Sequence, residues 1–269
     1  MRLASLSMYV SPPPVAWAQE EFWAFLRDWL KQAGIAEVPQ QLDRSVAYNV
    51  AWYDRGLLLA QTCGYPYAKS LRGIVRLVAT PAYDRPGCDG PSMCSLLIAR
   101  RGEAGATLAD FRGRIAALNA YDSNTGANLF RAAVAPLAHG TRFFASVVET
   151  GSHAASIDAV AAGQADVAAI DCVTYGNFSA HAPERVSCLR IIGETPKGPG
   201  LPFVTRASAS DAEVEILRQA LADAIASPVL APARAALALK SFAILGDAAY
   251  EGLLDMEKAA EAAAYPVIA

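Results

Sequence analysis

Short apolar segments alternate with amphipathic ones along this 269-residue chain. The clearest example joins an apolar run at 114–118 to a helix predicted over 126–138, in which apolar residues recur on one face. A strand near 145–149 and a helix over 154–162 repeat the same order. Because strands and helices alternate in this way, the sequence predicts an α/β fold with mainly parallel sheets.

The composition excludes several classes of protein. Hydrophobic residues make up 54% of the chain and charged residues 18%, which argues against disorder. The net charge is −3 and there is no long basic run, so we expect no nucleic-acid partner. No stretch approaches the roughly 20 apolar residues of a membrane span, so we expect no direct membrane insertion.

The N-terminus and the cysteines indicate the cellular compartment of the protein. Residues 2–10 have the pattern of a first strand rather than the apolar core of a signal peptide, and prolines follow at 12–14. We therefore expect a cytoplasmic protein, or a periplasmic one if a signal was removed and a Met supplied. Five cysteines fit a reducing compartment, although Cys88 and Cys94 are close enough in sequence to pair. The spacing of the cysteines and histidines predicts no metal site, and no cofactor is expected.

The remaining elements are predicted from periodicity and from Gly or Pro stops. Strands are expected at 41–45, 56–60, 74–79, 95–100, 166–171, 189–192 and 203–207, and helices at 17–33, 211–226, 229–239 and 247–264.

A polar turn at 121–128 stands between the strand and the helix of the clearest example. Its central residues are Ser123, Asn124, Thr125 and Gly126. Such side chains cap helices, and a capped helix is the simpler interpretation. Three of them closed by a glycine also offer hydroxyls, N–H groups and the positive end of a helix dipole to an anion. Further polar turns at 61–67 and 150–153, together with Asp171, follow other strands, which favours a ligand cleft.

Three segments in this order resemble a known family. They are Thr-Leu-Ala-Asp-Phe-Arg-Gly at 107–113, Asp-Ser-Asn-Thr-Gly at 122–126, and the Gly-Ser-His to Asp segment at 151–171. Together they resemble the phosphate/phosphite/phosphonate-binding group of ABC-transporter solute receptors. The resemblance implies a type II periplasmic-binding-protein-like fold, with a mainly parallel sheet in each of two lobes and a ligand cleft between them. Lobe 1 would comprise 1–95 and 196–269, and lobe 2 would comprise 96–195.

The resemblance also implies a set of ligand-binding residues. The turn would hold the phosphonate oxygens, and a histidine from the next turn would add a donor. Asp171 would meet a polar or cationic group, or a protonated acid oxygen, and an aromatic side chain of the first lobe would close over the ligand. The residues expected in the site are Ser123, Asn124, Thr125, Gly126, Ser152, His153, Asp171, Tyr65 and, as a second aromatic candidate, Tyr9.

The function implied is a solute-binding protein for ABC-type uptake or sensing, without catalysis. Its partners would be a small anion, phosphonate or phosphate-like, and an ABC-transporter permease. One alternative is an enzyme on the same fold, with Asp171 or His153 as general acid or base and Cys63 as a further candidate. Another is a regulatory module that senses the ligand. The sequence shows no nucleophile–base pair, which favours binding over catalysis.

Overall fold

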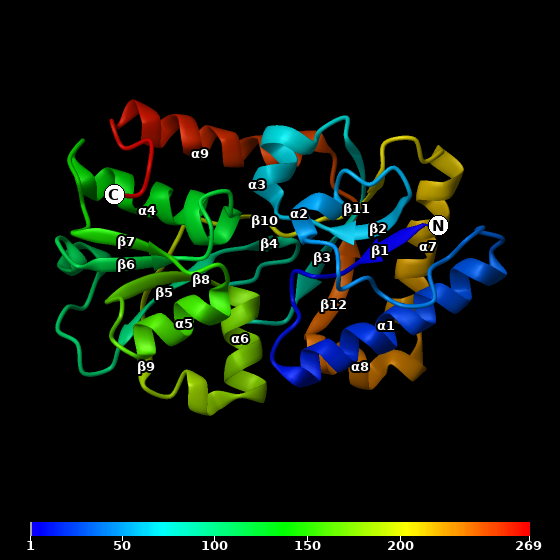
Figure 1. Cartoon of the computed structure of the whole chain (residues 1–269), viewed down its shortest axis with the longest axis horizontal. Coiled ribbons are helices and arrows are strands. Elements are labelled where there is room, and N and C mark those ends of the chain that lie inside the picture. The colour runs from blue at the N-terminus through cyan, green and yellow to red at the C-terminus, as the bar shows by residue number, and fades with distance from the viewer. Residues whose placement is uncertain (1) are drawn as a thin grey trace. The chain divides into compact units, whose positions relative to one another are not determined.

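The computed structural model describes residues 2–269, which divide into two compact units (Figure 1). Unit 1 comprises the chain up to Asp84, Asp89–Pro91 and Pro199–Ala249. Unit 2 comprises Arg85–Cys88, Ser92–Gly198 and Tyr250–Ala269. Each unit contains one five-stranded sheet with helices packed on it, which confirms the predicted α/β class.

Unit 1 is built on a sheet with the strand order β1-β2-β11-β3-β12. Helix α1 packs against α7 and α8, and Phe22 on its buried face lies near the sheet residue Phe242, with ring centroids 6.3 Å apart. The strands and helices of this unit are β1 (Leu3–Ser5), α1 (Pro13–Gln32), α2 (Tyr48–Ala51), β2 (Leu57–Gln61), α3 (Gly64–Pro66), β3 (Val75–Tyr83), β11 (Phe203–Arg206), α7 (Asp211–Ala226), α8 (Ala231–Leu237) and β12 (Leu239–Ala243).

Unit 2 is built on a sheet with the strand order β7-β6-β8-β5-β9. Helices α4 and α9 cover one face of this sheet, and α5 and α6 cover the other (Figure 1). Its strands and helices are β5 (Ser95–Arg100), β6 (Ile115–Leu118), a π-helical turn η3 (Asn124–Asn128), α4 (Leu129–Ala138), β7 (Ser146–Glu149), α5 (His153–Ala161), β8 (Val167–Asp171), α6 (Cys172–His181), β9 (Leu189–Glu194) and α9 (Glu251–Ala262).

Short elements complete the chain. They are η1 (Tyr67–Leu71), β4 (Ser92–Met93), η2 (Leu108–Phe111), η4 (Pro183–Arg185), β10 (Gly198–Pro199), η5 (Pro228–Leu230) and η6 (Asp247–Tyr250). Strands β10 and β4 form a separate two-stranded sheet. Within residues 2–269, no single helix is long and apolar enough to cross a membrane, although α7 and residues 228–237, bent by 67°, pass that test as a pair.

The strand directions are mixed rather than mainly parallel. In unit 2, β6 pairs in parallel with β7 and β8, whereas β5 pairs antiparallel with both β8 and β9. In unit 1, β1 and β2 are parallel, whereas β11 runs antiparallel between β2 and β3, and β12 pairs antiparallel with β3. Strands β9, β11 and β12 pair with strands that lie far from them in the sequence, and each of these pairs is antiparallel. The alternation of strands and helices along the chain does not reveal such pairings.

The C-terminal residues belong to unit 2, whereas lobe 1 was predicted to include all of 196–269. The reason is hydrophobic burial: Ala260, Tyr265 and Ile268 lie in the same core cluster as Phe130 and Val134 of α4. A hydrogen bond from Asn128 to the Leu253 carbonyl also holds α9 on unit 2. The boundary between the units therefore falls at 249/250 in this part of the chain.

Two local predictions are corrected by the structure, and one helix was missed. The strand expected at 41–45 is absent because the Asp43 carboxylate accepts hydrogen bonds from the backbone of Ser45 and Val46, both at 2.8 Å, which makes a turn. The helix expected over 229–239 ends at Leu237, and the following residues form β12. Helix α6 was not predicted, since its first turn is rich in Val and Thr.

Candidate anion-binding site

The polar turns of unit 2 meet at one edge of its sheet. Strands β7, β6 and β8 are parallel, so their carboxyl ends lie on the same side. The turn of η3 follows β6, His153 begins the helix after β7, and Asp171 ends β8. The structure therefore brings together the turn, His153 and Asp171 at this edge of the sheet, and their role in binding a ligand stays a prediction.

The turn at Ser123–Gly126 is a buried helix start. Ser123 is the N-cap, and its Oγ accepts the N–H of Gly126 at 3.1 Å. The capping interpretation is thus correct for Ser123. The first N–H groups of a helix have no acceptor within the helix, so those of Asn124 and Thr125 stay available at the positive end of the dipole. Residues Asn124 and Thr125 are 0% and 1% exposed.

Thr125 and His153 join the two turns directly. The Thr125 Oγ1 and His153 Nε2 atoms lie 2.9 Å apart, within hydrogen-bonding distance. Burial lowers the pKa of His153 from its ordinary 6.5 to about 4, so the ring is neutral at pH 7. A neutral imidazole has one donor and one acceptor nitrogen. The tautomer of His153 therefore decides whether Nε2 donates to the Thr125 hydroxyl or accepts from it. His153 Nδ1 is buried and has no hydrogen-bond partner.

Gly126 is required by a close approach that the sequence did not reveal. A Cβ added to Gly126 would lie 1.7 Å from Asn119 Oδ1 and 3.2 Å from His153 Cε1. Asn119 and His153 therefore pack onto the backbone of the turn itself. Asn119 Oδ1 and Asn124 Nδ2 are buried and unpartnered, like His153 Nδ1. Three such atoms around one turn point to a polar ligand, because a buried polar group without a partner costs about 1–3 kcal/mol.

Asn119 and Ser95 were both missed at the sequence level. Ser95 lies opposite Asp171 in the β5–β8 pair, and its Oγ donates to the Thr125 carbonyl at 2.6 Å. Only the pairing of β5 with β8 shows that Ser95 lies next to the polar turn. Asn119 carried a weak signal, since it is the first polar residue after an apolar strand.

Asp171 caps the next helix. Its Oδ1 accepts the N–H groups of Val173 and Thr174, each at 2.9 Å, and the residue is 2% exposed. Ser152 caps α5 in the same way, with its Oγ 3.1 Å from the N–H of Ala155. Both residues thus have structural roles, and their contact with a ligand stays a prediction.

The two aromatic candidates belong to unit 1. The Tyr65 hydroxyl accepts a hydrogen bond from Lys69 Nζ at 2.9 Å, and Tyr65 is 5% exposed. Tyr9 packs edge-on against Tyr83, with ring centroids 5.6 Å apart. Their role in closing over a ligand stays a prediction.

Asn128, at the end of η3, serves the fold rather than a ligand. Its Nδ2 donates to the Leu253 carbonyl at 3.0 Å, and its Oδ1 accepts from Arg131 at 2.7 Å. Arg131 also lies 3.8 Å from Glu257 of α9. These bonds hold the C-terminal segment on unit 2. Across residues 2–269, no cluster of three or more His, Cys, Asp or Glu side chains is arranged to hold a metal ion.

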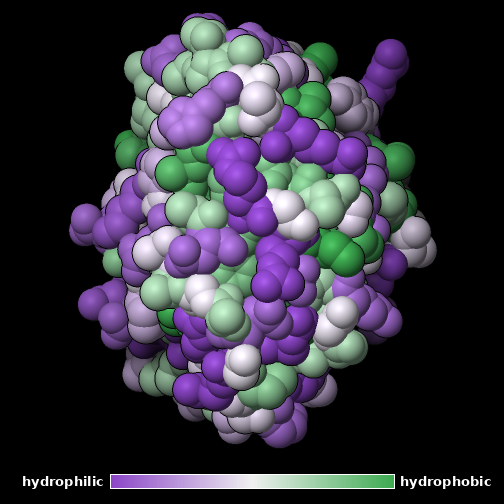
Figure 2. Space-filling view, turned by 90° about the vertical axis from the view of Figure 1, so that its left-hand side faces the viewer, coloured by the Kyte–Doolittle hydropathy of each residue, from purple (hydrophilic) through white to green (hydrophobic). Residues whose placement is uncertain are grey.

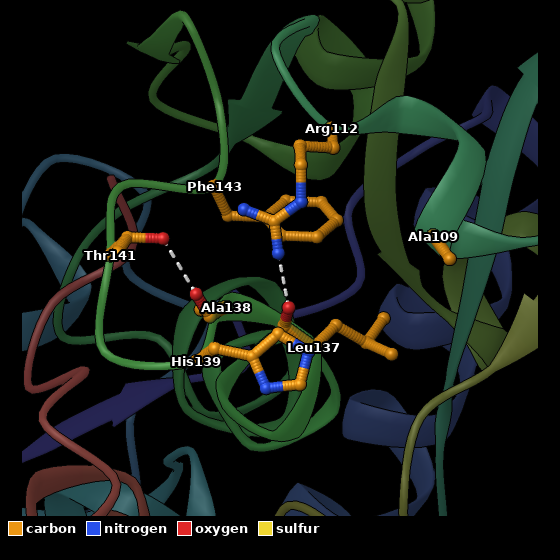
Figure 3. Close-up of a pocket in the computed structure, with 7 residues that line it drawn as sticks. All are labelled: Ala109, Arg112, Leu137, Ala138, His139, Thr141 and Phe143. Atoms are coloured by element: carbon orange, nitrogen blue, oxygen red, sulfur yellow. Dashed lines mark hydrogen bonds between the residues drawn. The ribbon is translucent and has the colours of Figure 1, made fainter.

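A cavity of about 310 Å³ lies at the opposite edge of the same sheet, near the start of β6 (Figure 3). The Arg112 guanidinium stacks 4.6 Å from the Phe143 ring and donates to the Leu137 carbonyl. Thr141 Oγ1 donates to the Ala138 carbonyl at 2.7 Å. Two of its polar side chains, Arg112 and Thr141, are thus engaged with backbone carbonyls of the cavity wall. Figure 2 shows one side of the molecule, on which hydrophilic and hydrophobic residues are intermixed.

A family model for the periplasmic substrate-binding protein of phosphonate ABC transporters matches residues 54–250, which is more than half of the chain. The chain belongs to this family. A search of curated proteins found no significant match. The phosphonate-binding family is therefore assigned from the family model.

Solved structures show the same fold at low sequence identity. The binding protein component of an ABC phosphonate transporter from Pseudomonas aeruginosa is 20% identical, with a TM-score of 0.77 over 98% of this chain and 87% of that one. PhnD1 from Prochlorococcus marinus, solved with methylphosphonate, is 13% identical, with a TM-score of 0.76 over 97% and 98%. A Xanthomonas citri protein bound to ATP is 18% identical, with a TM-score of 0.69 over 98% and 97%. These phosphonate-family and related structures confirm the periplasmic-binding-protein-like fold.

Proposed function

We propose that this protein binds a phosphonate, or a related phosphorus oxyanion, at the Ser123–Gly126 turn and delivers it to an ABC-transporter permease. One observation carries the proposal. The Asn124 Nδ2 and His153 Nδ1 atoms are buried without partners beside the Thr125 hydroxyl, at the start of a helix. A tetrahedral oxyanion would accept several hydrogen bonds there at once.

The donors proposed for this site are neutral. Burial keeps the pKa of His153 at about 4, so His153 contributes no positive charge at pH 7. The other donors are the Ser123 hydroxyl, the Asn124 amide and backbone N–H groups. The His153 tautomer adds one more: Nδ1–H when the Thr125 hydroxyl donates to Nε2, or the Thr125 hydroxyl when Nε2–H donates to it. Their arrangement around the anion, together with the helix dipole, would hold it without an ion pair.

We further propose that the protein binds its ligand without turnover, in the periplasm. One of the groups considered for catalysis supports this. The Asp171 Oδ1 accepts two backbone N–H groups as the cap of α6. The family to which the chain belongs consists of substrate-binding proteins and carries "periplasmic" in its description.

The test is a binding panel on the whole protein. It contains methylphosphonate, phosphate and ATP, the first and last because related structures were solved with them. Sulfate and acetate serve as comparison anions. A ligand at about 100 times its dissociation constant adds roughly 2.7 kcal/mol to stability, which a melting curve detects. Stabilisation by sulfate or acetate, with none by the phosphorus compounds, would contradict the ligand class.

Variants test the location of the site. We expect the double variant Ser123→Ala/Thr125→Val to bind the phosphorus ligand roughly 100-fold or more weakly. It loses the Ser123 hydroxyl and, depending on the His153 tautomer, either the Thr125 donor itself or the hydrogen bond that orients the His153 ring. The control Thr141→Val also loses a threonine hydroxyl in unit 2, but its hydroxyl bonds the Ala138 carbonyl at the opposite edge of the sheet. Equal affinities for the double variant and the control would rule out this turn as the site.

A further inference from the structure

Three cysteines from separate segments meet in unit 2. Cys88 precedes β4, Cys94 precedes β5, and Cys172 is the first residue of α6. The Sγ atoms of Cys88 and Cys172 lie 3.4 Å apart, and the Cys172 thiol also hydrogen-bonds Cys94. All three are free thiols in this structure.

The backbone around Cys88 is pressed onto its partners. Gly87 has a φ of +92°, and a Cβ added to it would lie 2.9 Å from Cys94 Sγ and 3.3 Å from Cys172 Sγ. Arg85 anchors the same segment to α6, since its Nη2 donates to Asn177 Oδ1 at 2.9 Å. Cys88 is therefore held beside Cys172 by its neighbours and needs little movement to bond with it.

The two thiols differ in access and in acidity. Cys88 is half-buried, whereas Cys172 is 0% exposed. The hydrogen bond from Cys172 lowers the pKa of Cys88, whereas the hydrogen bonds with Cys88 and Cys94, followed by burial, raise the pKa of Cys172. Cys88 is thus the thiol suited to meet an external reagent, because the thiolate is the nucleophile.

We propose that Cys88 and Cys172 form a reversible disulfide by exchange with an external disulfide. The Cys88 thiolate attacks one sulfur of the donor and expels the other as a thiolate, which leaves a mixed disulfide on Cys88. The Cys172 sulfur then attacks Cys88 Sγ and expels the second donor thiolate. Two protein thiols are oxidised, one donor disulfide is reduced, and the two protons leave with the donor thiols.

The disulfide has a structural consequence at the anion-binding edge. It ties the segment 85–88 to the first residue of α6, directly after Asp171. The structure thereby supplies a pairing that sequence spacing did not suggest, since only Cys88 and Cys94 are neighbours in the chain. Closing a long loop by a disulfide stabilises a fold mainly by restricting the unfolded chain.

The test uses the whole protein in glutathione buffers, either reduced or rich in glutathione disulfide. Free thiols are alkylated after denaturation, and the peptides are mapped without reduction. Cleavage before Asp89 separates Cys88 from Cys94, and cleavage after Arg185 separates Cys172 from Cys188. We expect a Cys88–Cys172 cross-linked peptide, two fewer free thiols, and a melting temperature higher by about 5 °C or more in the oxidised form.

Two variants sharpen this test. Cys88→Ser should lose both the cross-link and the redox-dependent melting shift, whereas Cys188→Ser, at an exposed cysteine, should keep both. The mapping on the unmodified chain stands on its own if a variant folds poorly. Five alkylated thiols in the oxidising buffer, a Cys88–Cys94 cross-link, or only a glutathione adduct on Cys88 would each overturn the proposal.

Discussion

The buried ring of His153 should make stability depend on pH in a way that one substitution removes. Its pKa is about 4 in the folded protein and 6.5 when unperturbed. The folded state therefore favours the neutral ring, and the unfolded chain takes up a proton first as the pH falls. The stabilisation is complete above pH 6.5 and is lost as the pH falls from 6.5 towards 4.

The magnitude follows from those two values. Between pH 7 and pH 5, the unfolded chain gains protonation free energy that the folded state does not, which amounts to about 2 kcal/mol for this one group. For a chain of this size that corresponds to roughly 4–8 °C in melting temperature. His153→Gln retains a hydrogen-bonding amide near Thr125 but does not titrate.

The assay is urea unfolding at pH 7 and pH 5. We expect the unsubstituted protein to lose about 2 kcal/mol more than His153→Gln over this interval. His139→Asn is the control, since it removes an exposed histidine at a positive φ of 53° that asparagine tolerates. The same loss for His153→Gln and the unsubstituted protein would refute the burial argument.

Two further substitutions test the packing of the site. Gly126→Ala should destabilise the protein by about 1–3 kcal/mol, because its Cβ would overlap Asn119 Oδ1, whereas Gly252→Ala in α9 meets nothing within 4 Å and should be neutral or stabilising. Equal melting temperatures for these two variants would contradict the close approach. Asp171→Ala should cost about 1 kcal/mol by removing the cap of α6, whereas Asp171→Asn should retain most of it, as chemical unfolding would measure. An equal loss in both would argue against capping.

Much of the fold could be predicted because the signals are local. Helix α7 runs over Asp211–Ala226 as predicted, since Ser210 caps it and its apolar residues follow one face. The Ser123 cap and the helix after it were also readable from a few neighbouring residues. A local prediction failed at 41–45, where a strand was expected but the Asp43 carboxylate accepts the N–H groups of Ser45 and Val46 and makes a turn.

The sequence by itself determined the α/β class, the polar turn and the family, because capping, periodicity and a short motif all act over a few neighbouring residues. Tertiary structure alone decided which distant groups share a site. The contact of Asn119 with Gly126, the hydrogen bond between Thr125 and His153, and the approach of Cys88 to Cys172 all depend on it. The physical reason is that these contacts depend on the order of strands in the sheet and on which hydrophobic residues pack together. Neither can be recognised from the local spacing of residues along the chain.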